Sequence, residues 1–134
     1  MDSPTDPLIG RTVDQRYRVE AFVARGGMAT VYRATDQRLE RTVALKIMHA
    51  SFAEDPDFVA RFVTEARSAA RLSHPAIVAV YDQGAADGLV YLAMEFVEGR
   101  TLRDCLTEQG RLTGVSATEI FDPILQALNA AHSA

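Results

Sequence analysis

Three features of the sequence combine residue types suited to holding an anionic ligand. Gly26 and Gly27 form a turn between two segments rich in β-branched and aromatic residues. Adjacent glycines leave no side chain in the way, so backbone N–H groups can approach phosphate oxygens. Lys46 lies in an apolar segment, where a covered ammonium group needs an anionic partner. Glu65 is a candidate for that partner, and pairing would leave the ammonium able to reach phosphates.

Each feature also has a simpler explanation. The two glycines alone are more typical of a hairpin that binds nothing, and Lys46 alone fits a solvated lysine on an edge strand equally well. Glu65 shares a helical face with apolar residues three, four and seven positions away, which predicts that it faces inward. The alternative is a surface salt bridge with Arg61 or Arg67, which would contribute little.

The periodicity of the chain predicts the elements that position these residues. Three strand-like segments are followed by a helix that Asp55-Pro56-Asp57 opens, by two further strands and finally by helices. The predicted strands are 17–23, 30–34, 42–48, 77–81 and 89–96, and the later helices are 101–109 and about 116–133. Five strands with one helix inserted after the third predict an α+β fold.

Composition excludes several classes of function. The chain has 134 residues and a formal net charge of −4, which disfavours nucleic acid as a partner. Cys105 is the only cysteine, so neither a disulfide framework nor a metal site is expected. No apolar run is long enough to span a membrane, and the N-terminus lacks the pattern of a signal peptide. These residues are therefore expected to be intracellular.

Four motifs occur in an order and spacing that resemble a known family. They are V-A-L-K at 43–46, R-F-V-T-E-A at 61–66, L-S-H-P-A-I-V at 72–78 and M-E-F-V-E-G-R-T-L-R-D at 94–104. Together with the glycine turn, they resemble the N-terminal half of a bacterial serine/threonine protein kinase domain. The resemblance covers about residues 15–134 and is greatest to the actinobacterial receptor-like kinases, within them the PknL-like branch.

The resemblance implies a role for each matching residue. Lys46 corresponds to the strand lysine that holds the α- and β-phosphates of ATP, and Glu65 to its partner on the helix. Met94 corresponds to the gatekeeper, and Asp104 to a residue that often contacts ribose. The glycines of the phosphate loop correspond to Gly26 and Gly27. The apolar roof over adenine corresponds to Val23, Val31 and Ala44, and the backbone contacts to the adenine edge correspond to Glu95 and Val97.

The sequence departs from the family pattern in two ways. Ala24 and Ala29 replace the first and third glycines of the phosphate loop, and Ala24 is expected to stiffen the loop and weaken its cover over the nucleotide. No H-R-D and no D-F-G motif occurs in these residues, so the base-positioning residue and the Mg²⁺ ligands are absent. A parent kinase is expected to transfer the γ-phosphate to protein Ser or Thr, while these 134 residues alone are expected to be inactive. The alternative is a non-catalytic module that binds nucleotide or dimerises.

The resemblance also implies a division of the chain and its contacts. The expected parts are a flexible lead at 1–14, an N-terminal lobe at 15–94, a hinge at 95–99 and the start of a second lobe at 100–134. Self-association is expected through the apolar side of the last helix or through a back surface with Arg16, Leu39 and Asp82. The domain is expected in the cytoplasm, with any membrane anchor in a further part of the parent protein.

Overall fold

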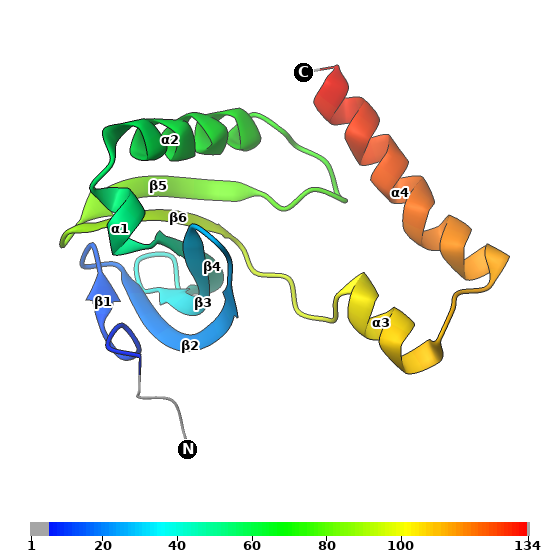
Figure 1. The fold of residues 1–134 in the computed structure, drawn as a ribbon, viewed down its shortest axis with the longest axis horizontal. Helices are drawn as coiled ribbons and strands as arrows, with labels where there is room; N and C mark the ends of the chain where they lie inside the picture. The colour runs from blue at the N-terminus through cyan, green and yellow to red at the C-terminus, as the bar shows by residue number, and fades with distance from the viewer. Residues whose placement is uncertain (1–5, 134) are drawn as a thin grey trace.

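The computed structural model describes residues 6–133, and one curled antiparallel sheet forms its larger part (Figure 1). The strands lie in the order β1-β2-β3-β4-β6-β5. Their bounds are Thr12–Val13 (β1), Tyr17–Arg25 (β2), Ala29–Asp36 (β3), Arg41–Met48 (β4), Val80–Ala86 (β5) and Leu89–Glu95 (β6). Strands that follow each other in the chain are neighbours in the sheet, apart from β4 and β5, which β6 separates. The sheet is therefore assembled mostly from hairpins.

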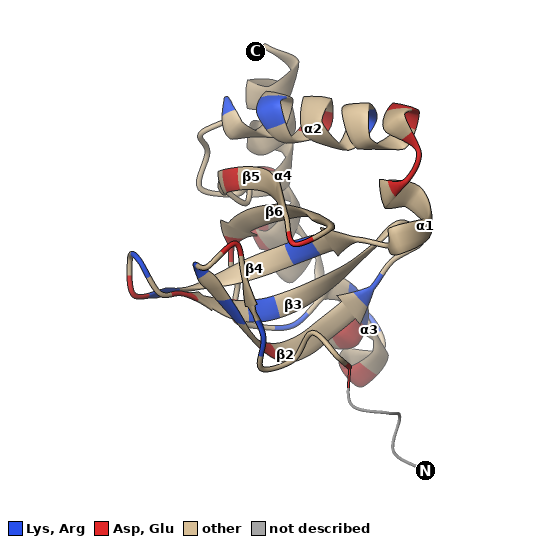
Figure 2. Ribbon diagram, turned by 90° about the vertical axis from the view of Figure 1, so that its left-hand side faces the viewer, with Lys and Arg blue, Asp and Glu red and all other residues tan. Residues whose placement is uncertain are grey.

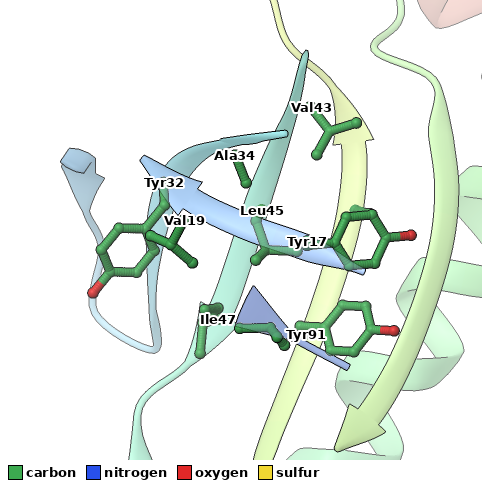
Figure 3. Close-up of a cluster of buried hydrophobic side chains, with 10 residues drawn as sticks. Tyr17, Val19, Tyr32, Ala34, Val43, Leu45, Ile47 and Tyr91 are labelled. Carbon is green, nitrogen blue, oxygen red and sulfur yellow. The ribbon is translucent and has the colours of Figure 1, made fainter. Parts of the chain in front are cut away.

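Alternation along the strands gives the sheet two distinct faces. Residues directly opposite each other on antiparallel strands share a face. Tyr32 lies opposite Leu45 on what we call the core face, whereas Val31 lies opposite Lys46 on what we call the lysine face. The curled sheet encloses a buried cluster on the core face, shown in Figure 3. Its members are Val13, Tyr17, Val19, Tyr32, Ala34, Val43, Leu45, Ile47, Tyr91 and Ala93.

The lysine face is covered in part by helix α2, Pro56–Ala70, which follows the short helix α1, Ala50–Ala53. Pro56 occupies the first turn of α2, and the Asp55 side chain accepts a hydrogen bond from the N–H of Asp57 at 2.9 Å. The helix buries Phe62 and Ala66 in a second cluster that contains Met48, Val90 and Leu92. This packing fixes α2 against the β5 edge of the sheet, with Met48 as the residue of β4 in the shared cluster (Figure 1).

Two further helices follow the sheet, α3 at Leu102–Gln109 and α4 at Gly114–His132. Thr101 is the N-cap residue of α3, and Thr113 caps α4 by accepting a hydrogen bond from the N–H of Ser116. Figure 1 shows α4 standing apart from the sheet. Ala127 is the buried residue of α4, and most of its large apolar side chains are exposed. Among the residues described, no helix has the length and hydropathy needed to cross a membrane.

The structure differs from the sequence prediction at three elements. The segment predicted as a flexible lead up to residue 14 contains β1 and places Val13 in the core, while residues 1–5 of that lead lie outside the described residues. Helix α1 was not predicted. Strand β5 covers 80–86 instead of 77–81, so Gly84 lies within a strand and not in the predicted loop. The sheet therefore has six strands where five were expected.

Candidate functional site

The strand register places four of the predicted site residues on the lysine face. Val31 lies opposite Lys46, and Ala44 lies opposite both Arg33 and Met94. Ala44 is buried, whereas Val31, Lys46 and Met94 are half-buried. The result is an apolar surface with an ammonium group at one end, which suits a flat apolar ring attached to an anionic tail. Figure 2 shows basic residues along β3 and β4, the strands that form this surface.

The glycine turn joins β2 to β3 at the edge of this surface. The Gly26 N–H donates to the carbonyl oxygen of Ala29 at 2.8 Å, which closes the turn. Neither Gly26 nor Gly27 takes a positive φ, so backbone strain is not the reason for two glycines here. A Cβ atom added at Gly27 would meet nothing within 4 Å. The glycines therefore leave open space above the turn, as close approach of a phosphate requires.

Val23 is placed less firmly than the other apolar site residues. The pairing of β2 with β3 shifts between Phe22 and Ala24, so Val23 has no partner directly across the sheet. Its side chain is 48% exposed. Its contribution to an apolar roof stays a prediction.

The predicted ion pair between Lys46 and Glu65 is wrong for this conformation. Glu65 is exposed, and no ion pair within residues 6–133 joins it to Lys46. The buried side of α2 passes through Phe62 and Ala66, one turn apart, with Val59 packed beside them. Glu65 lies at the margin of this stripe, and its side chain is in solvent. In kinases this pair must form for activity, and the position of the helix controls it.

The segment after β6 holds the predicted hinge residues. Glu95 is anchored to the loop before β5: its N–H donates to the Ala79 oxygen at 2.8 Å, and its Oε1 accepts from the Ala79 N–H at 3.0 Å. Val97 follows with 63% of its surface exposed. The Glu95 side chain thus has a structural partner, while the backbone around Val97 is open to a ligand.

Asp104 has a structural role in this conformation. Its carboxylate accepts from the Thr101 N–H at 3.3 Å, and its own N–H donates to the Thr101 hydroxyl at 3.0 Å. These reciprocal bonds form a capping box at the start of α3. Asp104 is exposed, so a carboxylate oxygen still has free lone pairs. Contact with a ribose stays a prediction.

Sequence reasoning missed a charged cluster on the opposite side of the sheet. Asp36, only 1% exposed, accepts hydrogen bonds from Arg16 at 2.9 and 2.8 Å, and Asp82 lies 3.4 Å from the same guanidinium. The bonds from Arg16 lower the pKa of Asp36 to about 2, with help from the N–H groups of Arg38 and Leu39. The Asp36 carboxylate accepts from the N–H groups of Arg38 and Leu39 and so closes the turn after β3. An aspartate at the start of a turn is the one local signal in the sequence that could have indicated this role of Asp36.

The same cluster changes the interpretation of the predicted back surface. Arg16 and Asp82 pair with each other within the chain, so their charges are already partly satisfied. Leu39 is 54% exposed on the neighbouring turn. Within residues 6–133 no group of three or more His, Cys, Asp or Glu residues is arranged to hold a metal ion.

Comparison with known proteins identifies relatives of this chain. The protein kinase domain family matches residues 17–134. The serine/threonine-protein kinase PknL of Mycobacterium bovis is 48% identical over 129 residues, which are 96% of this chain and 32% of that protein. The serine/threonine-protein kinase PrkC of Bacillus subtilis is 43% identical over 125 residues, which are 93% of this chain and 19% of that protein.

A search of solved structures also finds bacterial kinase domains. The crystal structure of the PknI kinase domain of Mycobacterium tuberculosis matches with a TM-score of 0.78 and 30% identity. The match covers 92% of this chain and 50% of that one. The chain therefore spans about a third of the length of the PknL relative and half of the solved kinase domain.

Proposed function

Because the chain belongs to the protein kinase domain family, matched over residues 17–134, we propose that its lysine face binds ATP. The observation that carries the proposal is the register that aligns Val31 with Lys46 and Ala44 with Met94. In this proposal the adenine ring packs against Ala44 and Val31, and the backbone near Val97 meets its polar edge. The open turn at Gly26 and Gly27 and the Lys46 ammonium receive the phosphates.

A longer protein that contains these residues is proposed to be a serine/threonine protein kinase, as their relatives are named. In that protein ATP would donate its γ-phosphate to a Ser or Thr hydroxyl of a protein substrate. The residues of this chain would contribute binding and orientation: Lys46 holds phosphate charge, and the apolar strand residues exclude water from the ring. The aspartate and asparagine that hold Mg²⁺ in complete kinase domains belong to motifs that do not occur in these 134 residues.

These 134 residues alone are proposed to bind nucleotide without transferring phosphate. They contain neither H-R-D nor D-F-G, which supply the base-positioning residue and the metal ligands in kinases. The unpaired Lys46 and Glu65 agree with a state that is not arranged for catalysis. We expect no phosphate transfer to a general Ser/Thr substrate protein from [γ-³²P]ATP, and transfer at a rate that depends on Lys46 would contradict this part of the proposal.

A second candidate function is a dimerisation module, and the exposed apolar side of α4 favours it. Phe121, Ile124, Leu125 and Leu128 are between 39% and 62% exposed on this helix. Sedimentation equilibrium can test it with two single changes, Leu125→Glu on α4 and Leu39→Asp on the back surface. Loss of dimers in only one variant identifies the surface used, and a wild-type chain that is monomeric at high concentration contradicts the module.

Two localisations remain proposals as well. A cytoplasmic kinase domain is the expectation from composition and family, and a membrane anchor would lie in other parts of the longer protein. Fractionation of cells that express the full-length protein distinguishes a membrane-bound from a freely diffusing parent.

Calorimetric titration with ATP tests nucleotide binding directly. Lys46→Met should weaken ATP binding about tenfold or more, since a hydrogen bond to a charged group contributes roughly 1.5–3 kcal/mol. Adenosine has no phosphates, so its affinity should be the same for both proteins. Arg38→Met, an exposed change in the turn after β3, is the matched control and should alter neither affinity. Equal ATP affinity for wild type and Lys46→Met would contradict the proposed orientation.

A further inference from the structure

A hollow lies behind the glycine turn, on the side of the sheet opposite Lys46. It has a volume of about 780 Å³, within the usual range for small-molecule sites. Its walls come from the segment before β1, the end of β2, the start of β3, the end of β4 and the start of β6. The lining residues include Ile9, Phe22, Thr30, Tyr32, Ile47 and Leu89.

The register separates this hollow from the proposed nucleotide site. Phe22 pairs with Tyr32, and Thr30 pairs with Ile47, and all four line the hollow. The residue between Thr30 and Tyr32 is Val31, which lies opposite Lys46 on the other face. The two sites therefore share strands but not side chains. The hollow is open to a ligand that does not compete with ATP for space.

A cationic side chain, Arg25, lines the hollow. Arg25 is exposed and makes no ion pair or side-chain hydrogen bond within the described residues. His49 places its Nε2 atom 3.0 Å from the Thr30 hydroxyl. Its other ring nitrogen, Nδ1, has no hydrogen bond among residues 6–133, and although His49 is the N-cap residue of helix α1, its side chain makes no capping hydrogen bond.

One acidic residue, Asp6, also lines the hollow, and its carboxylate already has donors. It accepts hydrogen bonds from the Tyr32 hydroxyl and, at 3.0 Å, from the Leu8 N–H. Each carboxylate oxygen of Asp6 thus has a donor within the chain. Arg25 and His49 are left to face a ligand, which gives the apolar hollow a basic side.

We propose that this hollow, behind the glycine turn, is a binding site for a small amphipathic anion, a molecule with an apolar body and a carboxylate head. The aliphatic and aromatic walls hold the body, and Phe22 and Tyr32 meet edge to face at 6.5 Å to form one of them. The Arg25 guanidinium holds the head, because arginine matches the planar geometry of a carboxylate. The Nδ1 atom of His49 provides a second polar contact.

Octanoate is the probe for this site, and octyltrimethylammonium is a control with the same apolar chain and the opposite charge. Methyl and amide NMR spectra of the 134-residue chain are recorded during titration with each, without nucleotide. Octanoate is expected to give saturable shifts at Ile9, Ile47 and Leu89, and the cation is not. Because no nucleotide is present, this result does not depend on the proposed ATP site.

Two charge reversals on the same strand sharpen the test. Arg25→Glu should weaken octanoate binding about tenfold or more, because an attractive charge at the head becomes a repulsive one. Arg18→Glu makes the same change at an exposed position of β2 that does not line the hollow, and should leave the affinity unchanged. Both sites are exposed, so both variants should fold.

Three results would overturn the proposal. The first is the absence of saturable shifts at the lining residues. The second is equal binding of the anion and the cation, or shifts confined to the exposed face of α4 around Leu125, which would indicate general association of amphiphiles with apolar surface. The third is an unchanged octanoate affinity in Arg25→Glu.

Discussion

The sheet and helix α4 both carry many large apolar residues, but the sheet buries them and α4 leaves most of them exposed. In the sheet, Leu45 and Val43 have no exposed surface, and Tyr91 has 1%. On α4, Leu125 and Leu128 keep 62% and 48% of their surface exposed. Helix α2 lies between these extremes, because Phe62 and Ala66 are buried against the sheet. The sheet with α2 thus forms its own core, whereas α4 buries little apolar surface within the described chain.

This difference separates stability from association. Hydrophobic stabilisation scales with the apolar area removed from water, so the free energy of unfolding should depend on the sheet and hardly on α4. The apolar side of α4 can gain stabilisation only from a contact that the described chain does not make. Paired substitutions, one in each region, can break or sharpen the comparison.

The largest effect is expected from truncating a leucine in each region. Leu45→Ala should lower the free energy of unfolding by about 3 kcal/mol, because it leaves a cavity in the core. Leu125→Ala should change it by less than about 0.5 kcal/mol, since that side chain is already largely in water. Urea denaturation at low protein concentration measures both. Similar costs at the two positions would show that α4 is packed in solution.

The same regional contrast explains how much of the fold the sequence could predict. The strands at 17–25, 29–36 and 41–48 and the long helices were predicted within a few residues, because their periodicity is local. Strand β5 was displaced because Asp82 and Gly84 are typical turn residues, and only pairing with β6 makes them a strand. The two-residue strand β1 likewise depends on its partner, Tyr17–Arg18.

The candidate site shows the same limit. Val31, Ala44, Lys46 and Met94 were chosen from the family resemblance, and the strand register places all four on one face. Their role in nucleotide binding stays a prediction. The orientation of Glu65 depends on the rotation of α2 against the sheet, which no local pattern encodes. The bond between Arg16 and Asp36 joins residues 20 positions apart and has no periodic signal.

The second contrast is between ion pairs. Asp36→Ala should cost roughly 2 to 3 kcal/mol, because it removes the partner of Arg16 and the acceptor for two turn N–H groups. Glu108 lies on α3 and forms an exposed ion pair with Arg100, which precedes the helix. Glu108→Ala breaks this pair and should cost less than about 0.5 kcal/mol. Thermal unfolding of both variants beside the wild type measures the difference. A Glu108 cost that matches the Asp36 cost would contradict the assigned burial.

The third contrast is between two glycines. A Cβ atom at Gly84 would lie 2.7 Å from the Tyr91 hydroxyl, which donates to Asp14 at 2.5 Å, so Gly84→Ala should destabilise the sheet by about 1 to 2 kcal/mol. Gly114 begins α4 with nothing within 4 Å of such an atom. Gly114→Ala should therefore be neutral or stabilising by about 0.5 kcal/mol. Chemical denaturation distinguishes the two, and a tolerated Gly84→Ala would show that Tyr91 can move aside.

Acid should remove part of the stabilisation that Asp36 provides. The bonds from Arg16 hold the pKa of Asp36 at about 2, below the ordinary value of 3.8, so the folded state binds this proton less readily than the unfolded chain. The stabilisation is complete above about pH 4 and is lost as the pH falls toward 2. Protonation leaves one carboxyl oxygen able to accept, so the loss should be smaller than in Asp36→Ala. Unfolding curves of wild type and Asp36→Asn between these pH values should converge, and parallel curves would contradict the assignment.

The most direct test of the central claim is an amide NMR map of ATP binding to this chain. We predict saturable shifts at the glycine turn, around Val31, from Ala44 to Lys46 and from Met94 to Val97, with α4 unaffected around Leu125. That result would assign nucleotide binding to the lysine face of the sheet region alone. Shifts confined to the core side of the sheet or to α4, or no saturable shifts at all, would contradict it.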